Sequence, residues 1–143
     1  ACELLGKDRE AIRSLPPHEL MAEFFKRYLR ALLCRPQTLA IMAWEAVERN
    51  DLTRELEEVR VRTALEFFEL MDEDPPRDVD LTALVLLMAG AVQFLAVRSR
   101  VHKSLGGVDL TSEAGWTRIE AVIEDILRGV LGSGARDASG QDA

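Results

Sequence analysis

Apolar positions along the chain recur every three or four residues, which is the spacing of one face of an α-helix. Between residues 18 and 33 the apolar side chains share one broad face, and residues 116–130 keep a strict alternation of three and four. The prolines and several of the glycines lie at segment edges, and no long alternating pattern of a β-strand occurs. The pattern predicts an all-α fold, a bundle of about six helices.

The expected helix boundaries follow from proline, glycine and capping residues. The ranges are about 2–14, 18–33, 36–50, 52–72, 81–102 and 115–132. Asp51 is the expected N-cap of the fourth helix, and Thr111 or Ser112 that of the last. Two glycines, 106 and 107, are expected to end the fifth helix. Residues 133–143 are small and polar, and we expect them to be disordered.

The fifth of these segments carries no charged side chain from Leu81 to Val97. A membrane span needs about 20 mostly apolar residues, whereas Thr82, Gly90 and Gln93 interrupt this run. We therefore expect the helix not to cross a membrane. A helix that is apolar all round is normally buried on every side.

The last helix also carries more apolar surface than a single packing face requires. Two such helices predict a homodimer that buries both in a four-helix bundle, and a well-packed monomer core is the alternative. Small residues allow helix backbones to approach closely. The expected interface lies in residues 81–102 and 112–131 and comprises Ala83, Gly90, Val97, Ile119, Val122, Ile123, Ile126 and Val130.

Charge and composition exclude several functions. The net charge is −7, and no basic cluster marks a nucleic-acid surface. Two isolated cysteines (2 and 34) and two histidines (18 and 102) lack the spacing of a metal site, so no metal is expected. Two unpaired thiols fit a reducing, cytoplasmic location.

No pattern of catalytic residues emerges. The chain has neither a glycine-rich phosphate loop nor a GxSxG turn, and no Cys–His pair is suggested. Paired carboxylates lie on charged helical faces that we expect to be solvated, and Glu45 is likewise expected to be exposed. We therefore predict no enzymatic activity and no cofactor.

The order and spacing of the helices resemble the C-terminal domain of tetracycline-repressor-type (TetR-family) transcriptional regulators. The resemblance rests on FFKRYLRALLCRPQTLAIMAWEAVERNDLTRELEEV, a helix pair around an Arg–Pro turn, and on LTSEAGWTRIEAVIEDILRGVLG, which is similar to the closing helix of the family. It would make residues 1–132 one effector-binding and dimerisation domain. The family's N-terminal helix-turn-helix has no counterpart in this chain.

The resemblance implies a ligand-responsive repressor domain that homodimerises and binds a small, mostly apolar effector. Its contact with DNA would require the missing helix-turn-helix. The candidate effector residues are Phe25, Tyr28, Trp44, Phe67, Met71, Met88, Gln93 and Phe94, each of which fits a plain core position as well. Gln93 needs a partner, which is a ligand, a neighbouring helix or its symmetry mate. The alternative function is a helical dimerisation or interaction module without a small-molecule ligand.

Overall fold

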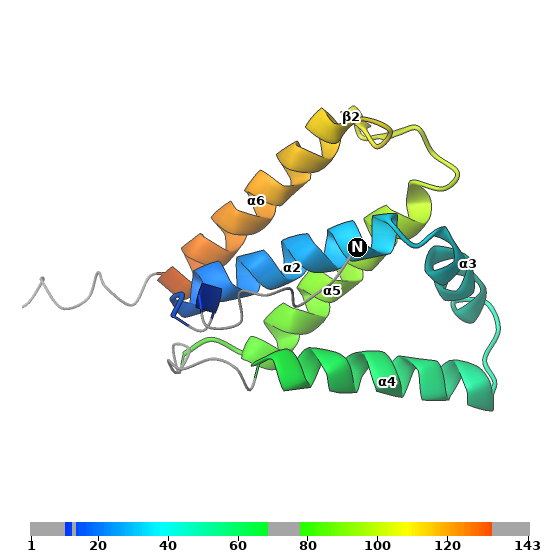
Figure 1. The fold of residues 1–143 in the computed structure, drawn as a ribbon, viewed down its shortest axis with the longest axis horizontal. Helices are drawn as coiled ribbons and strands as arrows, with labels where there is room; N and C mark the ends of the chain where they lie inside the picture. The colour runs from blue at the N-terminus through cyan, green and yellow to red at the C-terminus, as the bar shows by residue number, and fades with distance from the viewer. Residues whose placement is uncertain (1–10, 13, 69–77, 133–143) are drawn as a thin grey trace, which may run out of the picture.

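The computed structural model describes residues 11–12, 14–68 and 78–132, without the side chains of residues 65, 67 and 68. These residues form five helices and one short hairpin (Figure 1). In chain order the elements are α2 (Pro17–Leu33), α3 (Pro36–Glu45), α4 (Asp51–Phe68), α5 (Leu81–Arg98), β1 (Ser104–Leu105), β2 (Val108–Asp109) and α6 (Glu113–Leu131). The all-α class is confirmed. Most of the expected first helix and all of residues 133–143 lie outside the described residues.

The two glycines after α5 make a turn of the hairpin rather than ending the helix. α5 already ends at Arg98, and Gly106 and Gly107 connect the antiparallel strands β1 and β2. Their φ angles are +57° and +79°, which suit the two central residues of a tight hairpin turn and which residues with a Cβ rarely adopt. The expectation was wrong because a Gly–Gly pair signals a hairpin turn as readily as a helix end.

The helix caps are made by polar side chains close to the expected positions. Ser112 caps α6, since its Oγ accepts a hydrogen bond from the Gly115 N–H at 3.1 Å. The cap of α4 is Asn50 and not Asp51, because Asn50 Oδ1 accepts from the Thr53 N–H at 3.1 Å while Thr53 Oγ1 accepts from the Asn50 N–H at 3.0 Å. These two reciprocal hydrogen bonds satisfy the backbone N–H groups of Asn50 and Thr53 and fix the start of the helix.

The core is built around α2. This helix packs against α6, α5 and α3, and Figure 1 shows it running between α5 and α6. The largest fully buried side chains are Leu20, Met21, Phe25 and Leu29 of α2, Val92 of α5 and Leu127 of α6. Most of the apolar face predicted for residues 18–33 is thus the centre of the protein.

Ion pairs hold α6 along α2. Arg30 Nε and Nη2 donate to the two carboxylate oxygens of Glu120 at 2.6 and 2.8 Å, and Arg30 also pairs with Glu113. One turn earlier, Lys26 donates to Glu124. Bidentate guanidinium–carboxylate pairs define orientation as well as contact, so the angle between α2 and α6 is set by polar and apolar contacts together.

Candidate effector cleft and candidate dimer face

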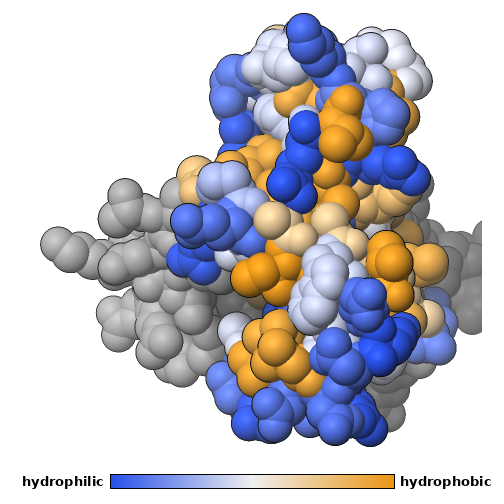
Figure 2. Space-filling model, turned by 90° about the vertical axis from the view of Figure 1, so that its right-hand side faces the viewer, coloured by the Kyte–Doolittle hydropathy of each residue, from blue (hydrophilic) through white to orange (hydrophobic). Residues whose placement is uncertain are grey.

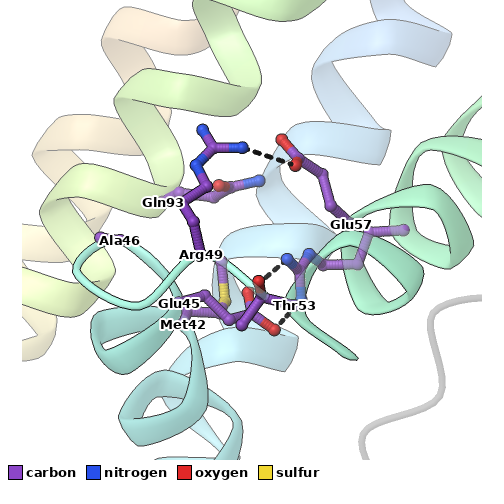
Figure 3. A pocket seen from close by; sticks show the side chains of 8 residues that line it. Met42, Glu45, Ala46, Arg49, Thr53, Glu57 and Gln93 are labelled. Carbon is purple, nitrogen blue, oxygen red and sulfur yellow. Dashed lines mark hydrogen bonds and ion pairs between the residues drawn. The ribbon is translucent and has the colours of Figure 1, made fainter. Parts of the chain in front are cut away.

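A cleft of about 170 Å³ lies between α3, α4 and α5 (Figure 3). Its lining is largely polar and is contributed by the C-terminal half of α3, the loop after it, α4 as far as Arg60 and one residue of α5. The lining residues are Met42, Glu45, Ala46, Arg49, Thr53, Glu57, Arg60 and Gln93.

One side of the cleft is closed by an ion pair between α3 and α4. Arg60 Nη1 donates to Glu45 Oε1 at 3.1 Å, and Arg60 Nη2 donates to Glu45 Oε2. The Glu45 side chain is only 8% exposed and that of Arg60 is 30% exposed. Contrary to the expectation of an exposed carboxylate, Glu45 is thus nearly buried and is neutralised by a residue fifteen positions further along the chain.

A second polar contact joins α5 to α2 beside this pair. Gln93 Nε2 donates to the Tyr28 hydroxyl at 2.9 Å, so in this chain the partner of Gln93 is a neighbouring helix. Burial raises the pKa of the Tyr28 hydroxyl, and the hydrogen bond from Gln93 and the positive charge of Arg60 oppose that rise. Tyr28, Gln93 and the Glu45–Arg60 pair therefore form one polar region at the cleft.

The rim of the cleft carries a looser pair. Arg49 Nη1 lies 3.7 Å from Glu57 Oε2, and the two side chains are 84% and 58% exposed. In Figure 3 the Arg49 side chain extends beside Gln93 toward Glu57. The separation exceeds that of a hydrogen bond, so this contact is an exposed ion pair without a hydrogen bond.

The structure disperses the candidate effector residues. Phe25 and Met88 are buried in the core, whereas Trp44 and Phe94 are exposed, the latter with the Arg98 guanidinium 5.2 Å from its ring centroid. Tyr28 and Gln93 meet beside the cleft, and only Gln93 lines it. The Phe67 side chain and Met71 lie outside the described residues.

Sequence reasoning missed the charged lining of the cleft. Arg49, Glu57 and Arg60 lie in a strongly charged segment that resembles a solvated helix face, and most of the described part of α4 is indeed exposed. A pairing between Glu45 and Arg60 depends on how α3 and α4 cross. No local spacing in the sequence encodes that crossing.

The outer face of α5 is apolar, and none of the described residues covers it. Ala83, Leu87, Gly90 and Phe94 are all exposed and follow a spacing of four, three and four. Leu86 and Leu87 are 73% and 72% exposed. The repeat is that of the seam between helices in a four-helix bundle.

A similar stripe lies on α6. Val122, Ile126 and Val130 are exposed, and Ile119 is half-buried, as is Val97 on α5. Ile123, by contrast, is buried in the core of the chain, so it faces the interior and not this stripe. We call the exposed stripes of α5 and α6 together the candidate dimer face.

Other exposed apolar residues are more scattered. At the end of the molecule where α3 lies, Figure 2 shows apolar patches divided by hydrophilic residues. Ile41 of α3 and Val47 after it are exposed. Isolated apolar side chains on a surface are common, so this end is less distinctive than the stripes of α5 and α6.

Within the described residues, α5 is also the one helix long and apolar enough to cross a membrane. Only Met88, Val92 and Ala96 of this helix are buried in the chain. In the same part of the chain, no three His, Cys, Asp or Glu side chains are grouped so that they could hold a metal ion.

Comparisons of the chain with protein-family models, with curated proteins and with solved structures give no match. The family resemblance of the sequence therefore stays a prediction. The functional argument rests on the cleft and on the candidate dimer face.

Proposed function

We propose that this chain is the ligand-responsive regulatory domain of a TetR-type transcriptional repressor, which homodimerises through α5 and α6 and binds a small effector in the α3–α4–α5 cleft. The observation that carries the proposal is the exposed 4-3-4 stripe of α5, and α6, on the other side of α2, carries an exposed apolar stripe of its own. Two helices from each of two copies make a four-helix bundle, in which the same surface serves both subunits.

A second copy suits this surface better than lipid does. α5 packs directly against α2, which carries Glu23, Lys26, Arg27 and Arg30 along its length. If α5 crossed a bilayer, these charges would be drawn toward hydrocarbon, where each costs at least about 2.5 kcal/mol. A partner helix covers the apolar stripe and leaves the charges of α2 in water.

The cleft supports an effector-binding domain over a plain dimerisation module. A module that only assembles has no need of a hollow between three helices, and such hollows between helices are common ligand sites. The expected effector was mostly apolar. The lining of this cleft is instead mainly polar, with Met42 and Ala46 as its apolar contribution.

Native mass spectrometry of the purified chain tests the proposal. A dimer is expected, and a chain that stays monomeric at micromolar concentration would contradict the proposal, because the stripe of α5 would then face water. A mass increment on the dimer that organic extraction removes would support effector binding.

Thermal unfolding separates the two functions. A bound effector raises the melting temperature by mass action, so small molecules that shift Tm favour the regulatory domain. A dimer whose Tm responds to no compound in a chemically broad panel would favour the interaction module. DNA should not bind specifically to this chain alone, and a salt-sensitive, sequence-selective gel shift would contradict that expectation.

A further inference from the structure

We propose that the α3–α4–α5 cleft binds a small zwitterion, a molecule that carries one carboxylate and one ammonium group, between Arg49 and Glu57. This inference rests on the proposed effector-binding function and names the chemical class of the effector.

The charges that line the cleft are balanced. Two arginines and two glutamates contribute, and Arg60 and Glu45 already satisfy each other through two hydrogen bonds. Since Glu45 is nearly buried, removing its partner would leave an uncompensated charge. This pair therefore stays closed, and the charges open to a ligand are those of Arg49 and Glu57.

The open pair is easily separated by a ligand. Its groups lie 3.7 Å apart without a hydrogen bond, and both are largely in solvent, where ion pairs contribute little. A ligand carboxylate can take the guanidinium while a ligand ammonium takes the carboxylate, and each charge then gains charge-assisted hydrogen bonds. A simple anion would leave Glu57 unpaired beside a like charge, and a simple cation would do the same to Arg49.

The size and remaining chemistry of the cleft fit the same class of molecule. Its volume of about 170 Å³ is below the range of roughly 300–1,000 Å³ for drug-sized ligands. Gln93 uses one amide N–H for Tyr28, so its second N–H and its carbonyl oxygen remain to hydrogen-bond a ligand. Met42 and Ala46 supply a small apolar surface for a short side chain.

The test is a thermal-shift screen of the full chain with the standard amino acids, followed by calorimetric titration of the tightest binder. The deaminated carboxylate and the decarboxylated amine of that binder serve as matched single-charge probes. We expect the zwitterion to bind at least about tenfold more tightly than either probe. Equal binding of a single-charge probe, or no binding of any zwitterion, would overturn the inference.

Substitutions locate the site. Arg49→Gln and Glu57→Gln should each weaken zwitterion binding about tenfold or more, because each removes one charge-assisted contact. Arg54→Gln is the matched control. Arg54 is exposed on α4, the helix that carries Glu57, and it pairs with Asp51 and does not line the cleft. Equal loss in the control and in the two cleft variants would place binding elsewhere.

Failure of this inference is distinguishable from failure of the proposed function. A dimer that binds an apolar compound but no zwitterion would retain the regulatory role and refute the ligand class. A monomer would refute the dimer whatever it binds.

Discussion

Replacing Gly90 by glutamate should weaken dimerisation without destabilising the folded protomer, so this variant distinguishes the two properties. Gly90 lies in the middle of the exposed stripe of α5, and apart from its own helix backbone and chain neighbours no atom of the described residues lies within 4 Å of a Cβ placed there. The new side chain therefore fits the isolated protomer without a clash. Because glycine is a poor helix residue, the substitution should even stabilise the folded protomer by about 0.5 kcal/mol.

The effect on the dimer has the opposite sign. Two-fold symmetry introduces the carboxylate twice, and burial of an unpaired charge costs several kcal/mol per ion. Even about 1.5 kcal/mol for each copy totals about 3 kcal/mol, which corresponds to a roughly hundredfold increase in the dimer Kd.

Sedimentation velocity over a concentration series measures this shift, and urea unfolding of the dissociated variant measures protomer stability. Val59→Glu is the matched control, because it introduces the same charge at an exposed apolar position of α4. An unchanged dimer Kd for Gly90→Glu would refute the reasoning, and so would an equal loss of association in the control.

Three further predictions concern the protomer. Gly115→Ala should destabilise the fold by about 1–3 kcal/mol in urea unfolding, because the added Cβ would lie 1.7 Å from the backbone carbonyl oxygen of the residue that ends β2. Tyr28→Phe should cost about 1 kcal/mol through loss of the hydrogen bond from Gln93, and Tyr28→Phe in a Gln93→Leu background should cost less. The hydrogen bond that Arg30 donates to Glu113 lowers the pKa of the Glu113 carboxyl, so the contribution of this pair to stability is present above the unfolded pKa of about 4.3 and is lost as pH falls through the folded pKa. Denaturation curves from pH 6 to pH 3 should show that loss, and Glu113→Gln should reduce it.

The periodicity of the sequence was sufficient to predict which segments are helical, because each helix is amphipathic or is bounded by proline, glycine or capping residues. α2 begins one residue before the expected start and ends at Leu33, as expected. α3 ends at Glu45, five residues before the expected end at residue 50. Tertiary contacts decide such ends, and hydrophobic spacing does not record them.

The residues that line the cleft were harder to predict from the sequence. Aromatic residues and methionines were the natural candidates for an effector site. In the structure, however, Phe25 and Met88 are buried in the core, and Phe94 is exposed on the surface. The groups that do line the cleft come from three helices and the loop between α3 and α4, and their meeting depends on the angles at which the helices cross. Gln93 was the exception, because an amide within an apolar helix requires a partner wherever it lies.

The attachment of α4 has a consequence for hydrogen exchange. Among its described side chains only Thr53 is buried, and the ion pairs of Arg60 and Glu57 are its main polar links to the segment that precedes it. Segments with few buried apolar contacts open locally at a small fraction of the global unfolding free energy. Amide protons of α4 should therefore exchange with deuterium much sooner than those of α2. A molecule bound between Arg49 and Glu57 should slow exchange in α4 more than in the other helices.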